Sequence, residues 1–192
     1  MSIKIVLLAA GLSKRMGGIN KLLTPVNGKP LILYSVENAL SYSSSVYVVT
    51  GHEREKVENI LSSYPVNIIY NQAYHEGQET SLKTALNAVD GPLIVMPSDM
   101  PFITKTDFER CEKELDGYEC ARAFYNREAG HPVALSRSFV EIYRSDTTHR
   151  VRTLSKLVSH NFYIAGPASI MDVDTQDDLK KTESMLKKEN MK

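Results

Sequence analysis

The sequence lacks the features that mark thiol-based metal and redox proteins. Its 192 residues include no tryptophan and two cysteines, Cys111 and Cys120, which form no CxxC pair. Zinc and redox centres need closer or more numerous thiol ligands. The two cysteines therefore predict a structural or incidental role, and their scarcity is typical of a reducing compartment.

Long apolar runs are also missing. The apolar run that begins at Ile3 covers about six residues before Gly11 and several charges follow, whereas the core of a signal peptide needs roughly 7–15. No segment reaches the ~20 apolar residues of a membrane span. We therefore expect a cytoplasmic protein that does not engage a membrane.

An excess of charge of one sign is absent too. Lys plus Arg and Asp plus Glu both number 23, so the net charge is zero. Broad binding to nucleic acid usually requires a strong basic excess, and we expect no nucleic-acid partner. At this length one hydrophobic core is the default, so residues 1–192 are expected to form a single domain.

The first two thirds of the chain alternate between strand and helix patterns. Short β-branched runs predict strands at 3–8, 46–49, 66–70 and 92–96. Helical spacing or capping predicts helices that begin near Pro30 and cover 53–63, 79–89 and, after the N-cap Thr104, 105–115. This alternation favours an α/β fold with a mostly parallel central sheet covered on both faces.

The remainder of the chain is less regular. Strands are predicted at 118–124 and 131–136, and helices at 139–145 and in the 150s. The end, ASIMDVDTQDDL, predicts a short strand, a turn and a helix capped by Asp174 or Thr175.

The loop GLSKRMGGINK, residues 11–21, follows the first predicted strand. In an open α/β sheet, ligands bind at the carboxyl ends of the strands. The loop has neither the GxxxxGK[ST] spacing of a P-loop nor a GxGxxG fingerprint. On its own it fits either an anion-binding loop with close backbone N–H groups or a polar turn with solvated cations.

Carboxylates at two distant places could complete such a site. Asp99 follows the apolar run 92–96, and a carboxylate there suits Mg²⁺ or, alternatively, a turn before Pro101. Asp172 and Asp174 alternate along the predicted strand and so share a face. Either could be the second metal ligand; we favour Asp172, because Asp174 could instead cap the last helix.

The loop also resembles a known signature. LAAGLSKRMGGINK is similar to the LAAGxSxRMGxxK motif of the MobA/MocA-like molybdenum cofactor nucleotidyltransferases. The similarity continues in register through KPLI, VVTGHE, NQAYHEGQETSL, PSDMPF, GHPVAL and DVDTQDDL, and so covers nearly the whole chain. The resemblance implies a three-layer, Rossmann-like nucleotide-diphospho-sugar transferase fold.

The implied activity is transfer of a nucleotidyl group from a nucleoside triphosphate, with Mg²⁺, to a phosphorylated acceptor with release of pyrophosphate. LAAG, rather than LAGG, is similar to the branch that uses CTP and molybdopterin. Alternatives are a guanylyltransferase of the same pathway, a cytidylyltransferase for another phosphorylated acceptor such as a sugar or isoprenoid phosphate, or a non-catalytic nucleotide-binding chaperone. The resemblance also suggests a molybdoenzyme or its chaperone as a partner.

The resemblance implies roles for individual residues. Arg15, Lys21 and Asp99 are the expected catalytic residues, and Asp99 and Asp172 the expected metal ligands. Lys14 is expected to be a solvated neighbour. The expected nucleotide-binding residues are Leu8, Ala9, Ala10, Gly11, Leu12, Ser13, Arg15, Lys21, Asn71, Gly77 and Ser81, of which Ser81 is also a plausible residue of a helix N-terminus.

Three segments differ from the family pattern or have a role that the sequence leaves open. Glu79 stands where small residues are usual. His131 lies in a GHP segment that resembles a GxP turn on the acceptor side, where it is either a lining or a structural residue. Residues 143–160 contain no glycine and carry Arg144, Arg150 and Arg152, which could bind the acceptor phosphate or form a solvated helix face.

Overall fold

The computed structural model describes residues 3–145 and 158–189. Its main feature is a seven-stranded sheet in the order β5-β4-β1-β6-β8-β7-β9. These strands are β1 (Lys4–Ala9), β4 (Val46–Thr50), β5 (Asn67–Tyr70), β6 (Leu93–Pro97), β7 (Cys120–Tyr125), β8 (Glu128–Leu135) and β9 (His160–Ile164). The predicted strands of the first two thirds are confirmed within a residue or two.

The half of the sheet formed by β5, β4, β1 and β6 is parallel. On the other side β8 runs antiparallel to both β6 and β7, and β9 pairs parallel with β7. Only β8 therefore runs against the common direction among the strands of this sheet. The expected mostly parallel α/β sheet is confirmed.

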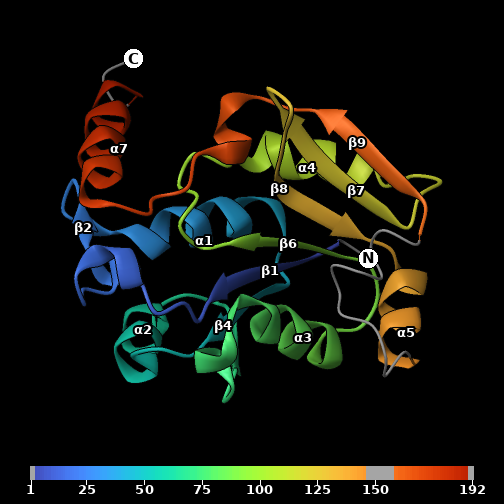
Figure 1. Ribbon diagram of the computed structural model, residues 1–192, viewed down its shortest axis with the longest axis horizontal. Coiled ribbons are helices and arrows are strands. Elements are labelled where there is room, and N and C mark those ends of the chain that lie inside the picture. Colours follow the sequence, from blue (N-terminus) through green and yellow to red (C-terminus); the bar gives the residue numbers. More distant parts are fainter. Residues whose placement is uncertain (1–2, 146–157, 190–192) are drawn as a thin grey trace.

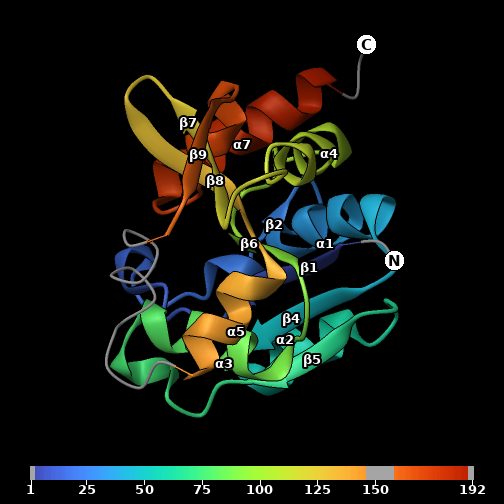
Figure 2. The same cartoon turned by 90° about the vertical axis from the view of Figure 1, so that its right-hand side faces the viewer.

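Helices cover both faces of the sheet (Figures 1 and 2). The hydrophobic core on one face joins the sheet to α1 (Leu31–Tyr42), α2 (Arg54–Leu61) and α4 (Lys105–Lys113). The core on the other face joins it to α3 (Gln78–Ala88) and α5 (Arg137–Ser145). Strand β1 supplies Ile5 and Leu7 to the first core and Val6 to the second, as expected of a strand buried on both faces.

A few short elements complete the described chain. A two-stranded ribbon pairs β2 (Pro25–Val26) with β3 (Lys29–Pro30). The 3₁₀ turns are η1 (Lys14–Met16), η2 (Lys21–Leu23), η3 (Tyr74–Glu76) and η4 (Pro167–Ile170). Within residues 3–145 and 158–189, no helix combines the length and the apolar character that crossing a bilayer requires.

One expectation for the C-terminal third is corrected. The structure has no strand at 168–174; η4 and an extended loop occupy this region, while the strand β9 lies earlier, at His160–Ile164. Phe162 and Ile164 of this edge strand are exposed and only Tyr163 is buried, and its sequence, HNFYI, has neither a long apolar run nor an apolar–polar alternation. The helix predicted in the 150s lies outside the described residues.

The last helix, α7 (Gln176–Glu189), packs beside the ribbon and the start of α1. Thr175 caps it, because its hydroxyl accepts from the Asp178 backbone N–H at 3.2 Å while the Asp178 carboxylate accepts from the Thr175 N–H at 3.0 Å. This reciprocal pair resolves the choice between Thr175 and Asp174. Asp174 is left to make other contacts.

Candidate active site

Segments far apart in the sequence meet at the carboxyl edge of the parallel strands. Leu8 of β1 lies opposite Pro97 of β6. The chain that leaves β1, residues 10–13, therefore lies next to Asp99, which follows β6. This is the edge at which open α/β sheets bind ligands.

A pocket of about 520 Å³ opens at this edge. Three groups of residues line it: the loop after β1 with η1 and η2, the segment from η3 into α3, and the acidic segments after β6 and before α7. The lining residues are Leu8, Ala10, Gly11, Leu12, Ser13, Lys14, Arg15, Lys21, Leu22, Tyr74, His75, Gly77, Gln78, Ser81, Pro97, Asp99, Asp172 and Asp174.

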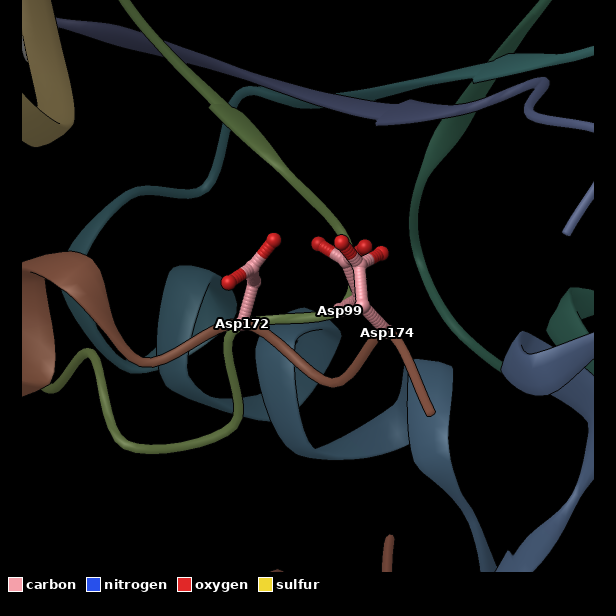
Figure 3. Close-up of side chains that lie close together, drawn as sticks. All are labelled: Asp99, Asp172 and Asp174. Carbon is pink, nitrogen blue, oxygen red and sulfur yellow. The ribbon is translucent and has the colours of Figure 1, made fainter. Parts of the chain in front are cut away.

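Three carboxylates converge in the pocket (Figure 3). Asp99, Asp172 and Asp174 each offer an oxygen, and these atoms all lie within 4.8 Å of one another. Their side chains point to the same side of the two chain segments that carry them. The segments are joined by the Val173 N–H, which donates to the Asp99 carbonyl at 3.0 Å. Asp172 and Asp174 thus both meet Asp99, although no strand holds them.

Two cations of the loop contact this acidic cluster. Lys21 pairs with Asp99 and also lies 2.7 Å from Asp174, and Arg15 pairs with Asp174. The Lys21 side chain is 13% exposed, whereas that of Arg15 is 71% exposed. Burial alone would lower the pKa of Lys21. The charges and hydrogen bonds of Asp99 and Asp174 outweigh burial and raise this pKa, so Lys21 is protonated and positively charged.

The carboxylates differ in their electrostatic surroundings. Burial alone would raise the pKa of Asp174, but the hydrogen bond and charge of Lys21, with Arg15, hold it below its ordinary value. The pKa of Asp172, which is exposed at the mouth of the pocket, is raised by partial desolvation there and by repulsion from Asp99 and Asp174. The cluster therefore carries negative charge that its protein cations neutralise only in part.

The residues fit a divalent cation. Oxygen ligands from carboxylates are what Mg²⁺ prefers. Asp99 Oδ1 is buried and, in the part of the chain that the structure describes, has no hydrogen-bond partner. An unpartnered buried carboxylate oxygen is costly by itself, and a metal ion would satisfy it.

The structure places most of the predicted nucleotide-binding residues around the pocket. Ala9 and Asn71 are different, because both are 1% exposed and lie behind the lining. Asn71 Nδ2 donates to Thr80 Oγ1 at 2.9 Å and Ser81 Oγ at 3.0 Å. Asn71 thus holds the start of α3, and a direct contact of Ala9 or Asn71 with nucleotide stays a prediction.

Several lining residues were not singled out from the sequence. Tyr74, His75 and Gln78 form part of the wall that faces the loop after β1. Glycine at position 51 leaves room for Tyr74 and Ala10 to lie close together, because a Cβ at Gly51 would lie 2.6 Å from Tyr74 Cβ and 2.7 Å from Ala10 Cβ. The glycine in VVTGHE was the available signal, but its spatial partners were not visible in the sequence.

Other candidates lie away from the pocket lining. The GHP segment is part of β8 rather than a turn, and His131 Nδ1 is buried without a hydrogen-bond partner among the described residues. Burial, with the charge of Arg122, lowers the pKa of His131 to about 4. This histidine is a poor base, which agrees with a structural role.

Glu79 and Arg144, which belong to the segments that depart from the family pattern, also make contacts away from the pocket. Glu79 lies in the first turn of α3 close to α5, where its charge, after burial, raises the pKa of Tyr143. Arg144 Nε donates to the Leu86 carbonyl at 2.8 Å and its guanidinium pairs with Asp90, at the far end of α3. Arg144 therefore contacts helix α3 and Asp90, which follows it. Arg150 and Arg152 lie outside the described residues.

Comparison with known proteins agrees with this architecture. The chain is 30% identical over 181 residues to the molybdenum cofactor cytidylyltransferase of Escherichia coli, covering 92% of this chain and 93% of that protein. A nucleotidyl transferase structure from Methanothermobacter superposes with a TM-score of 0.81 at 22% identity, covering 96% and 97% of the two chains. A CMP:2-keto-3-deoxy-manno-octonic acid synthetase complexed with CTP superposes with a TM-score of 0.78 at 18% identity, covering 98% and 100%.

The structural similarities are below 25% identity and support the fold. The family rests on the sequence comparisons. Residues 5–161 match the model of the MobA-like NTP transferase domain, which is most of the chain, and the E. coli relative is similar over nearly its full length. The chain therefore belongs to the MobA-like NTP transferases and is a nucleotidyltransferase.

Proposed function

We propose that the protein transfers the CMP group of CTP to a molybdopterin-type phosphorylated acceptor and releases pyrophosphate. The observation that carries the proposal is the meeting of Lys21 and Arg15 with the carboxylates of Asp99, Asp172 and Asp174 in one pocket. Cations for phosphate oxygens and carboxylates for a metal ion are the two charge types that phosphoryl chemistry requires.

The loop after β1 is suited to bind the triphosphate. Gly11 and Ser13 line the pocket, and Gly11 has no side chain to keep an anion from its backbone. Arg15 is exposed and can reorient from Asp174 to chelate two phosphate oxygens. Lys21 supplies a buried point charge beside them.

Asp99 and Asp172, together with Asp174, are the residues that would hold Mg²⁺. When bound, this ion neutralises phosphate oxygens in the transition state. Attack needs no protein base, since the acceptor phosphate is already an anion, and the low pKa of His131 fits that expectation. The contribution of the chain is to position and neutralise the reactants.

The choice of CTP and molybdopterin is supported by the E. coli relative, whose name states a molybdenum cofactor and a cytidylyl group. LAAG in the loop supports the same choice. Guanylyl transfer or another phosphorylated acceptor would use the same charges, so these are the competing enzymatic activities. A non-catalytic nucleotide-binding chaperone is disfavoured, because binding alone does not require three converging carboxylates.

Substitution of Asp99 tests the proposal. Asp99→Asn preserves size but removes the charge of the most buried carboxylate, and we expect pyrophosphate release to fall by about 100-fold or more, since one electrostatic group in such a site contributes roughly 3 kcal/mol. CTP affinity measured without metal should change much less. Asp90→Asn, at the far end of α3, is the matched control and should keep wild-type turnover. Unaltered turnover of Asp99→Asn would remove this residue from the reaction.

A further inference from the structure

The turn that carries Asp99 is held by side chains of helix α1. Ser35 Oγ donates to the Ser98 carbonyl at 3.0 Å, and the Met100 carbonyl lies 3.3 Å from the same hydroxyl. Asn38 Nδ2 donates to the Pro101 carbonyl at 3.2 Å. Ser35 and Asn38 are one helical turn apart and so lie on the same face of α1.

The burial of Ser35 indicates that these contacts are specific. Ser35 is fully buried in the middle of α1, between the apolar residues that pack on the sheet. A buried hydroxyl costs free energy unless it is hydrogen-bonded. A helical serine commonly bonds the carbonyl of its own preceding turn, whereas Ser35 reaches across to a different segment.

Together with the Ile103 N–H, which donates to the Met100 carbonyl at 3.4 Å, these contacts give a donor to three of the four carbonyls of the turn, residues 98–101. The remaining one, that of Asp99, accepts from the Val173 N–H at 3.0 Å. Val173 stands between Asp172 and Asp174, so the same turn fixes both acidic segments. The turn that carries Asp99 therefore accepts hydrogen bonds from Ser35 and Asn38 on one side and from Val173 on the other.

We propose that Ser35, supported by Asn38, is a positioning residue that sets the affinity of the carboxylate cluster for a divalent cation. This inference rests on the proposed function, in which the cluster holds a metal. Mg²⁺ demands near-ideal geometry, so a small displacement of the Asp99 turn is sufficient to weaken its binding. Loss of outer contacts behind a metal ligand typically weakens metal affinity 10- to 100-fold.

The chain offers a matched control for Ser35. Ser43, 1% exposed at the end of α1, donates to the Ile3 carbonyl at 2.8 Å and accepts from the Ser45 N–H. Ile3 precedes β1, at the opposite edge of the sheet from the pocket. Ser43→Ala therefore removes comparable buried hydrogen bonds without touching the turn of Asp99.

The test is a titration of Ser35→Ala, Ser43→Ala and wild-type protein with Mn²⁺ alone, followed by electron paramagnetic resonance, with melting temperatures in parallel. We expect both variants to melt earlier, and Ser35→Ala to bind Mn²⁺ about 10-fold or more weakly while Ser43→Ala binds like wild type. Asn38→Leu, which keeps the side-chain size, should show the same defect to a smaller degree and carries the test if Ser35→Ala does not fold.

Equal Mn²⁺ affinity of Ser35→Ala and wild type, or an equal loss in Ser43→Ala, would overturn the inference and leave the proposed function intact. A wild-type protein that binds Mn²⁺ with the expected pattern of variants but transfers no nucleotide would reject the proposed function and keep the positioning role. A wild-type protein that binds no Mn²⁺ would overturn both.

Discussion

Among single residues, Lys21 is central to the balance of charge in the pocket. It contacts two carboxylates from segments far along the chain and is largely buried, whereas its neighbour Arg15 is exposed. A buried ammonium between two carboxylates is costly to remove, since the remaining charges are left unpaired. Lys21 contacts two of the three carboxylates, whereas Arg15 contacts one.

Replacement of Lys21 by methionine should therefore weaken triphosphate binding. A hydrogen bond to a charged group contributes about 1.5–3 kcal/mol, so Lys21→Met is expected to raise the Kd for CTP by roughly 10- to 100-fold. Lys14→Met, at the exposed rim of the same pocket, should change the Kd only a few-fold. Calorimetric titration would show the difference, and equal Kd values for Lys21→Met and wild type would place Lys21 outside the triphosphate site.

The two cysteines are also informative at this scale. Burial raises the pKa of Cys111 and of Cys120 to about 12 each. Only the thiolate is nucleophilic, so the native protein should not react with a disulfide reagent at pH 8, while the unfolded chain should expose both thiols. Rapid reaction of the native protein would contradict this burial.

The same raised pKa values predict a dependence of stability on pH. The unfolded chain loses these protons near its ordinary pKa of about 8.5, while the folded chain keeps them. The stabilisation is therefore complete below about pH 8.5 and is lost as the pH rises towards 12. Relative to wild type, a Cys111→Ala variant should show a smaller decrease in unfolding free energy over this window, measured by urea titration; an identical decrease would contradict the assignment.

At the scale of elements, the position of the acidic segment depends on the packing of η4 against β8. A Cβ at Gly130 would lie 2.2 Å from the Ser169 carbonyl oxygen. The Ser169 oxygen is a backbone atom and the position of a Cβ is fixed by its own backbone, so neither can rotate away. The close approach of these elements is therefore possible only with glycine at position 130, and it fixes the chain that leads into Asp172.

Gly130→Ala should therefore destabilise the protein and disturb the cluster. Overpacking of this kind costs about 1–3 kcal/mol, and Mn²⁺ affinity should fall as the 167–174 segment moves. Gly166→Ala is the matched control, because a Cβ there meets nothing within 4 Å and its φ of −86° suits alanine; we expect a change within about 0.5 kcal/mol. Chemical denaturation measures the free energy of unfolding of both variants. A Gly130→Ala variant as stable as the wild type would contradict the tight packing.

The elements also show what can be predicted from the sequence. Strands such as Lys4–Ala9 and Leu93–Pro97 are buried on both faces, so continuous apolar runs reveal them. The edge strand His160–Ile164 buries only Tyr163, and its sequence, HNFYI, has neither a long apolar run nor the alternation expected of a strand with one buried face. Asp172 and Asp174 meet Asp99 although the strand expected around them is absent. Their position comes from the backbone bond of Val173 and the close approach at Gly130, which are tertiary contacts without a local signature.

In the whole molecule, the order of the strands in the sheet determines which segments of the chain lie next to one another. Central strands β1 and β6 are neighbours although β4 and β5 come between them in the sequence. Their carboxyl ends bring the cationic loop and Asp99 together. The returning C-terminal chain adds Asp172 and Asp174 (Figure 3). The resemblance to a family identified this constellation, since no sequence spacing shows that Lys21 contacts Asp174.

Nucleotidyl transfer is tested by measuring pyrophosphate release with molybdopterin, Mg²⁺ and each of the four nucleoside triphosphates in turn. We expect release with CTP at a rate clearly above those with GTP, ATP and UTP, and no release when Mg²⁺ is removed by chelation. Faster release with GTP would replace the cytidylyl assignment by guanylyl transfer. No release with any of the four, from folded protein, would contradict nucleotidyl transfer to this acceptor.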